Sequence, residues 1–260
     1  MLAGLNISQG RAPMLKGTTC QMHAQELVVK HALGLQSRSK NKQAYDENVP
    51  GKALRDKVKI LVSTLMNKKK KNLFIKYKKY VEEELEQGEA LKLEIPNDTR
   101  VSGVFRMYES VLRAKKSLTL FCTNYEEYKE LFQPLLLTTE EWQDVAETHA
   151  ILKILNVVAM TSQQESVDSN VMSYIQIQTA RYNITCRSEF PVIQINGNWK
   201  PNTDINKIPT NTLSKNQLSQ NSRNLINNFQ REFTNYFKSP DSDQQTMMVF
   251  HPVIVCGGFR

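Results

Sequence analysis

Two residues near the start of the chain have the types and the spacing of a metal-binding pair. Cys20 and His23 lie three positions apart in the stretch Cys-Gln-Met-His. A thiolate and an imidazole can both bind zinc, but a zinc site needs about four ligands. Neither Cys122 nor His149 stands in a pattern that would supply the others. We therefore expect a structural role for Cys20 and His23, and we predict neither a bound metal nor another cofactor.

The other residues that commonly do chemistry stand in no pattern typical of catalysis. The cysteines are far apart, so we expect reduced, partly buried thiols at Cys20, Cys122, Cys186 and Cys256. The histidines have no acid or nucleophile at a useful spacing, so we expect core or surface positions for His31, His149 and His251. Neighbouring helical residues diverge by about 100°. Because such side chains cannot converge on one ion, a solvated acidic face is expected for Glu82, Glu83 and Glu84.

Lysine and arginine are concentrated in one part of the chain. Between Arg38 and Lys79 there are fourteen Lys or Arg and three Asp or Glu, in a chain of net charge +8. Such a block attracts polyanions, of which nucleic acid is the usual one. Its centre is the run Lys68, Lys69, Lys70 and Lys71, which could also serve as a nuclear import signal. The alternative is a solvated helix face without a partner.

Length and composition are those of a globular protein. The 260 residues can bury a sizeable core as one large or two small domains, and 40% of them are hydrophobic. No apolar run approaches the roughly 20 residues that span a membrane. The first residues lack the basic flank and apolar stretch of a signal peptide. We expect a nuclear or, alternatively, a cytoplasmic protein that does not enter a membrane.

Helical periodicity covers most of the chain. Apolar residues recur at helical spacing from Leu54 to Leu65, and the same period continues from Phe74 towards Gly88. Thr138-Thr-Glu-Glu141 matches a helix capping box ahead of an apolar run. The predicted helices cover residues 23–35, 54–65, 74–85, 104–118 with Ser102 as a cap, 142–160, 166–182 and 214–237.

The remaining segments are predicted to be non-helical. Residues 36–50 are polar and are expected to form a loop, and 91–96 is expected to be a brief strand or an extended segment before Pro96. Residues 190–212 contain three prolines and several asparagines, which predicts a long irregular connection. Trp142 is interpreted as a core anchor at the start of its helix, with a base-stacking platform as the alternative.

Three patterns, in this order along the chain, resemble the hAT superfamily of DNA transposases. The first is Cys20-Gln-Met-His23 followed by the apolar helix from Glu26 to Leu33. The second is Leu93-Glu-Ile-Pro-Asn-Asp-Thr-Arg-Val-Ser102, and the third is the helix that starts at Glu141-Trp142. A weaker match is Val249-Phe-His-Pro-Val253. Together they span roughly residues 18 to 258.

The resemblance implies a ribonuclease H-like catalytic fold into which a large helical domain is inserted. In such enzymes three acidic residues bind divalent metal, usually Mg²⁺, which activates the attacking oxygen and stabilises the leaving one. Two of these carboxylates would precede the Cys-x-x-His stretch, but the nineteen residues before Cys20 contain no Asp or Glu. The third would follow the His-Pro stretch, where the chain ends at Arg260. We therefore expect no catalytic residue and no enzymatic activity.

The resemblance also implies contacts with DNA. The family's Thr-Arg-Trp stretch places an aromatic ring where it could stack on a base, whereas this chain has Val101 at that position. Thr99 and Arg100 remain, and an arginine can contact phosphate. The family's N-terminal zinc finger has no counterpart here. DNA binding through Lys68 to Lys71, Thr99 and Arg100 is therefore expected to be weak and salt-sensitive.

These observations combine into one prediction of fold and function. The chain is expected to be mainly α, with residues 1–36 a remnant of the catalytic domain, 37–245 an all-helical insertion domain, and 246–260 an apolar tail. Short residual strand segments are expected at both ends. The expected function is that of a degenerate, transposase-derived DNA-binding protein that neither cleaves nor joins DNA by itself, and that self-associates or associates with intact transposases. The alternatives are a helical scaffold for protein interactions or oligomerisation, and a transposon fossil without selected function.

Overall fold

A computed structural model of the chain describes residues 21–36, 51–66, 71–96, 101–164, 170–197 and 199–237. Most of these residues are helical, which confirms the prediction of a mainly α protein. The helices are α1 (Gln21–Ala32), α3 (Lys52–Leu65), α4 (Lys71–Lys79), α5 (Val101–Arg113), α6 (Lys115–Asn124), α7 (Lys129–Phe132), α8 (Thr139–Gln164), α9 (Asn170–Thr185) and α10 (Gln220–Tyr236). The strands are β1 (Glu189–Ile193) and β2 (Thr210–Ser214).

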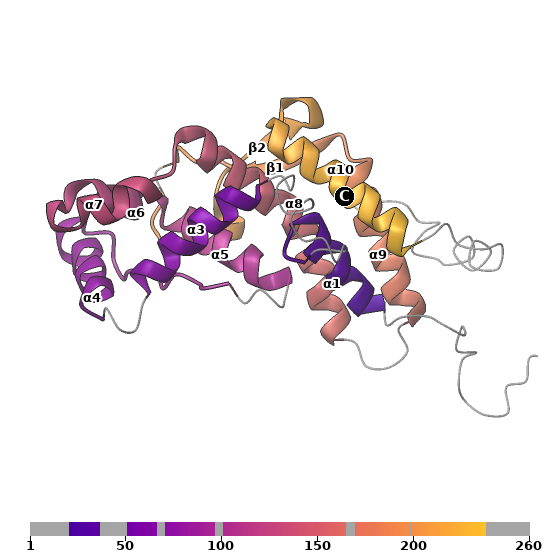
Figure 1. The fold of residues 1–260 in the computed structure, drawn as a ribbon, viewed down its shortest axis with the longest axis horizontal. Helices are drawn as coiled ribbons and strands as arrows, with labels where there is room; N and C mark the ends of the chain where they lie inside the picture. Colours follow the sequence, from indigo (N-terminus) through magenta and orange to yellow (C-terminus); the bar gives the residue numbers. More distant parts are fainter. Residues whose placement is uncertain are drawn as a thin grey trace, which may run out of the picture.

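The molecule is elongated, with different helices at its two ends (Figure 1). Helices α4, α6 and α7 form one end, and α1, α9 and α10 gather towards the other. Helix α8 packs against α5, α9, α10 and β1, so it connects the two ends. No helix of the described ranges is both long enough and apolar enough to cross a membrane.

The start of α8 confirms the predicted capping box. The Glu141 N–H donates to Thr138 Oγ1 at 3.2 Å, and the Thr138 N–H donates to Glu141 Oε2 at 2.9 Å. These reciprocal bonds satisfy backbone groups that have no partner within the helix. A cap of this kind contributes about 1 kcal/mol to stability. Trp142, the next residue, is 5% exposed, so its interpretation as a core anchor is confirmed.

Aromatic side chains fill the core at the end formed by α4, α6 and α7. Phe121 lies at their centre, and its ring centroid is 5.3 Å from that of Tyr77, 5.6 Å from that of Tyr80 and 4.7 Å from that of Tyr125. The Tyr77 hydroxyl lies 2.9 Å from Ser117 Oγ, so the polar atom that it buries has a partner. This cluster holds α4 in place. Helix α4 continues into a π-helical turn (Tyr80–Glu84), after which Gly88 adopts a φ of +80°.

Helices α1, α8, α9 and α10 share the core at the other end. As predicted, α10 buries its periodic apolar residues: Leu225, Phe229, Phe233 and the adjacent Phe237. Helix α1 packs against both α10 and α9, and Gln25 Nε2 donates to the Leu155 carbonyl of α8 at 3.3 Å. Residues 21–36 therefore share one core with helices of the 37–245 segment.

The prediction of one helix over 104–118 is wrong, because α5 and α6 are separate helices. The chain leaves helical geometry at Ala114, where φ is −90° and ψ is 4°. Ser102 is the second residue of α5, so it is not the helix cap that the sequence suggested. Both helices bury apolar residues at their own period, and the break between them cannot be seen in periodicity alone.

The prediction of an irregular connection over 190–212 is wrong at both of its ends. Strands β1 and β2 form an antiparallel pair in which Phe190 faces Leu213 and Val192 faces Asn211. The Gln194 N–H donates to the Pro209 carbonyl at 2.9 Å, so even-numbered residues of β1 bond to β2. Pro191 therefore lies on the edge where its missing N–H is not needed. This pair lies inside the segment expected to be all-helical.

Strand segments were expected at the chain ends, but the described strands lie between α9 and α10. Residues 246–260 and 1–20 lie outside the described residues. Residues 91–96 form neither a helix nor a paired strand, so the brief strand that was one alternative for them is not formed.

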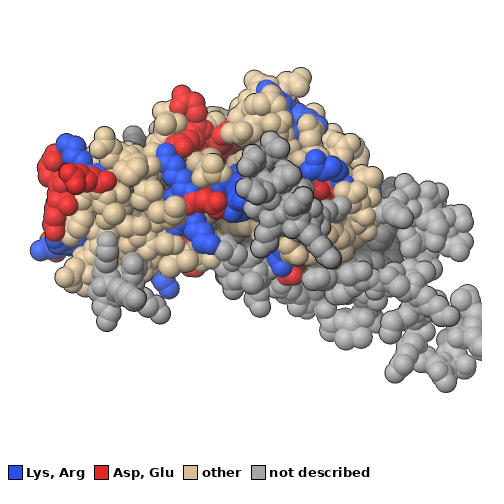
Figure 2. Space-filling model, viewed as in Figure 1, with Lys and Arg blue, Asp and Glu red and all other residues tan. Residues whose placement is uncertain are grey.

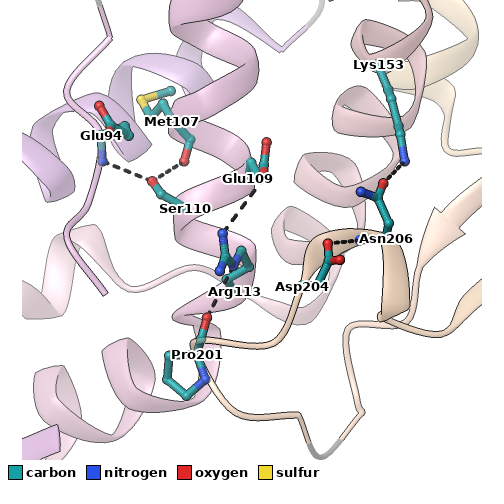
Figure 3. Close-up of polar contacts among 9 residues, drawn as sticks. All are labelled: Glu94, Met107, Glu109, Ser110, Arg113, Lys153, Pro201, Asp204 and Asn206. Carbon is teal, nitrogen blue, oxygen red and sulfur yellow. Dashed lines mark hydrogen bonds and ion pairs between the residues drawn. The ribbon is translucent and has the colours of Figure 1, made fainter. Parts of the chain in front are cut away.

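Polar contacts fix the long connection between β1 and β2 to the helices (Figure 3). Arg113 Nε donates to the Pro201 carbonyl at 3.2 Å, and Lys153 Nζ donates to Asn206 Oδ1 at 3.3 Å. Within the connection, Asp204 Oδ1 accepts from the Asn206 N–H at 3.0 Å and caps a short helical turn. These bonds join α5 and α8 to the connection, so the strands are held against the helical body.

Candidate nucleic-acid interface

The described basic residues of the lysine-rich block lie on α3 and α4. Both helices bury an apolar face, which includes Val58 and Val62 of α3 and Tyr77 of α4, so the intervening lysines are directed outwards. The two helices contact each other. We refer to their lysine-bearing faces as the α3–α4 surface, which comprises Lys52, Lys57, Lys59, Lys76, Lys78 and Lys79.

Carboxylates from outside the block neutralise part of this surface. Lys57 Nζ donates to both carboxylate oxygens of Glu141, at 3.0 and 2.8 Å. Lys76 Nζ lies 2.5 Å from Glu127 Oε2 and also donates to the Tyr128 hydroxyl at 2.9 Å. The face drawn in Figure 2 likewise shows Asp and Glu side chains beside Lys and Arg over α3 and at the end formed by α4 and α7. A count along the chain therefore overstates the local positive charge.

The ion pairs differ in how firmly they hold each lysine. Lys57 and Glu141 are only 24% and 28% exposed, and Glu141 is also part of the α8 capping box, so this pair is structural. Lys78 and Lys79 are 48% and 66% exposed, and they pair with glutamates four residues later at 3.7 and 3.6 Å. Exposed pairs of this kind contribute only about 0.3–0.5 kcal/mol. A phosphate can therefore replace these glutamates at little cost.

Several predicted site residues lie outside the described residues: Cys20, Lys68, Lys69, Lys70, Thr99 and Arg100. Lys71 begins α4 and His23 belongs to α1, but their side chains are not described. The run from Lys68 to Lys71 connects α3 directly to α4, so along the chain it stands between the two helices of the α3–α4 surface. Lys52 and Lys59 of that surface have interaction partners of their own.

Two of the three histidines expected at core or surface positions are buried. His149 is 2% exposed and its ring stacks on Phe105, with centroids 4.7 Å apart. Burial lowers the pKa of His149 to about 3, with a smaller contribution from Lys153, so the ring is neutral. His31 is 3% exposed and stacks on Tyr236 at 5.9 Å. His251 lies outside the described residues.

The described cysteines are both free, as predicted. Cys122 is buried, whereas Cys186 is exposed, so the prediction of a partly buried thiol is wrong for Cys186. Burial raises the pKa of Cys122 to about 12, which keeps the thiol protonated and unreactive at neutral pH. Over the described ranges, the His, Cys, Asp and Glu side chains form no group of three placed to hold a metal ion. Glu83 and Glu84 are exposed, as expected for an acidic face.

Sequence reasoning missed a groove of about 730 Å³ beside the first half of α8. Its wall on α8 includes the carboxylates of Glu140, Asp144 and Glu147, and its other side comes from β1, β2 and the residues that precede α10. None of the described residues that line it is Lys or Arg. The available signal was the spacing of the three carboxylates, which are four and three residues apart and therefore share one helix face.

Hydrogen bonds hold two carboxylates of this groove in place, those of Glu140 and Glu147. Hydrogen bonds to its own backbone and to Thr138 lower the pKa of Glu140. Glu147 is 1% exposed, and its two oxygens accept from Gln143 Nε2 at 3.0 Å and from the Ser219 N–H at 2.9 Å. The groove is therefore a negative region, in contrast to the α3–α4 surface.

Comparisons with protein families, with curated proteins and with solved structures find no match for this chain. The resemblance to hAT transposases consequently stays a prediction that the motifs alone support.

Proposed function

We propose that this chain is a degenerate, hAT transposase-derived protein that binds DNA weakly through the α3–α4 surface and the run from Lys68 to Lys71. The observation that carries the proposal is the exposure of Lys78 and Lys79, whose ion pairs are weak enough for phosphate to replace. Lys71 begins α4, seven positions before Lys78.

Salt dependence is the expected signature of such binding. Each lysine that contacts a phosphate of duplex DNA displaces condensed counterions, which adds about 0.9 to the magnitude of the slope of log affinity against log salt. Contacts to phosphate carry no sequence information. We therefore expect binding that depends on salt and on lysine number, with little preference between DNA sequences.

The proposal also covers location and activity. A lysine run of this type is consistent with a nuclear protein, with the cytoplasm as the alternative. We propose that the chain neither cleaves nor joins DNA by itself, and that it self-associates or associates with intact transposases. Incubation of the purified chain with duplex DNA and Mg²⁺ tests the first point, and DNA cleavage would refute it.

The test of DNA binding is a titration of labelled duplex and hairpin DNA, followed by fluorescence anisotropy at two salt concentrations. One variant replaces Lys68 to Lys71 by Gln, and a second combines Lys78→Gln with Lys79→Gln. The matched control for the second, Lys200→Gln with Lys207→Gln, removes the same charge from exposed positions outside this surface.

The proposal predicts that both test variants bind more weakly and with a shallower salt slope, while the control binds like the original chain. Undetectable binding at low salt would reject the proposal. Equal weakening in the control would show a response to net charge alone, and would reject the assignment to α3 and α4.

A further inference from the structure

The groove beside α8 has three kinds of lining: carboxylates, apolar side chains and amide side chains. Glu140 and Asp144 stand on α8. Leu213 of β2 and Ile195, which follows β1, supply half-buried apolar surface, whereas Val192 is only 1% exposed. Amide side chains complete the lining, among them Gln194, whose Nε2 donates to Asn211 Oδ1 at 2.7 Å.

The pairing of the strands explains why apolar and amide side chains occur together on one side of the groove. Directly opposite residues of an antiparallel pair project to the same face of the sheet. Val192 stands opposite Asn211 in the register of β1 and β2. Side chains alternate between the faces, so Gln194 and Leu213 belong to the same face as this pair. That face is therefore apolar in part and rich in amides, and it stands beside an acidic helix.

Charge complementarity selects the occupant of the groove. Three carboxylates line it, none of the described lining residues is Lys or Arg, and the nearby Lys115 Nζ donates to the backbone carbonyl of Ile195 at 2.8 Å. Glu147 is bonded on both oxygens, whereas Asp144 accepts from Asn221 Nδ2 at 2.7 Å through one oxygen and Glu140 is exposed. A ligand here must bring positive charge, apolar groups for the sheet face, and polar groups for the amides.

We propose that the groove binds an extended, lysine- or arginine-bearing segment of a partner protein. Glu140 and Asp144 are four residues apart, or about 6 Å along the axis of α8. Alternate side chains of an extended peptide repeat every 6.7 Å or so. Successive alternate lysines of the segment pair with these two carboxylates, and the residues between them contact the sheet face. The amide side chains bond the peptide backbone.

This inference does not rest on the proposed binding of DNA. The groove has the opposite charge to the α3–α4 surface, so phosphates are repelled from it. The residues that define it come from α8, from β1 and β2 with the residues after β1, and from the residues that precede α10, and none belongs to α3 or α4.

The experiment titrates a fluorescein-labelled peptide of alternating lysine and valine against the full chain and follows anisotropy. A second peptide has the same composition but all its lysines together. The test variant combines Glu140→Gln with Asp144→Asn, which keeps the acceptor that Asp144 Oδ2 offers to Asn221 Nδ2. The matched control, Glu84→Gln with Glu89→Gln, removes the same charge from exposed positions outside the groove.

We expect the alternating peptide to bind, and its affinity to fall about tenfold or more in the test variant, since truncating charge partners in an interface typically costs that much. The control should bind as the original chain does, and the peptide with contiguous lysines should bind more weakly. The proposal would be overturned if the alternating peptide did not bind, or if it bound the test variant as tightly as the original chain. Displacement of the bound peptide by spermidine or Mg²⁺ at equal charge concentration would overturn it too.

Discussion

The α3–α4 surface and the groove beside α8 are both charged, but the chain builds them in different ways. The lysines of the first belong to two neighbouring helices and to the run that joins them. The carboxylates of the second come from one helix, but they form a site only with strands that lie about fifty residues further along. A run of charged residues can be recognised in a sequence, whereas a groove formed by segments far apart in the sequence can be recognised only in the folded structure. The comparison predicts that each region can be altered without changing the other.

The largest effect is expected in the aromatic core that supports α4. Phe121→Ala should lower the free energy of unfolding by about 3–5 kcal/mol, because a fully buried ring is lost and a cavity remains. Urea denaturation measures this change. Ile75→Ala on α4 is the control, since Ile75 is 59% exposed and its loss should stay within about 0.5 kcal/mol. Equal effects of the two substitutions would contradict the packing described for α4.

Acid should destabilise the protein through His149, which stands two residues after the groove carboxylate Glu147. The folded-state pKa is lowered to about 3 from 6.5, so the unfolded chain binds the proton first as pH falls. Stability from this group is complete above about pH 6.5 and is lost progressively towards pH 3, by about 2–3 kcal/mol at pH 4.5. Urea unfolding at several pH values measures the loss. His149→Phe should show a smaller decline, and an equal decline in both proteins would assign it to other groups.

The connection that follows β1 contains a close approach between Gly197 and Trp199 that one substitution would disturb. A Cβ added at Gly197 would lie 2.0 Å from Cζ3 of Trp199, so Gly197→Ala must displace the indole. Overpacking of this kind costs about 1–3 kcal/mol. Thermal unfolding measures the loss, and DNA titration should show no change in affinity. Unaltered stability would contradict the close approach of Trp199 to Gly197.

The smallest effect separates two lysines of the α3–α4 surface. Lys57→Gln should lower stability by about 1 kcal/mol, because a half-buried pair that also supports the α8 cap is broken. Lys79→Gln should change stability by less than about 0.5 kcal/mol while it weakens DNA binding. Urea unfolding measures the stability of both variants, and DNA titration measures their DNA affinity. If Lys79→Gln destabilised the protein more than Lys57→Gln, exposure would not distinguish lysines that stabilise the fold from lysines that can bind DNA.

Local patterns in the sequence predicted the parts of the fold that depend on neighbours along the chain. The apolar spacing of α3 and α10 and the capping box at Thr138 require only residues within a few positions of one another. Strand β1 was missed because it contains Pro191 and because its partner β2 begins seventeen residues after β1 ends. The pairing is therefore stabilised by contacts that local propensity does not report.

The candidate site, like the fold, could be predicted from the sequence only where it depends on residues close together in the chain. The basic character of residues 38–79 followed from composition, but its partial neutralisation did not, because Glu127 and Glu141 stand far from the lysines in sequence. The groove was not predicted, since its apolar side belongs to the strands that were missed. Burial of Trp142 was expected from its place at the start of an apolar helix, and it is confirmed. His149, for which the sequence left core and surface positions open, is buried as well.

A crossed titration tests the separation of the two surfaces most directly. Two variants are compared: one replaces Lys68 to Lys71 by Gln, and the other carries Glu140→Gln and Asp144→Asn. Labelled duplex DNA and the peptide of alternating lysine and valine are each titrated with both variants. Our account predicts that the first variant loses DNA affinity and keeps peptide affinity, and that the second keeps DNA affinity and loses peptide affinity. The assignment of two independent surfaces is contradicted if either variant loses affinity for both ligands. It is also contradicted if the lysine variant keeps its DNA affinity and the carboxylate variant keeps its peptide affinity.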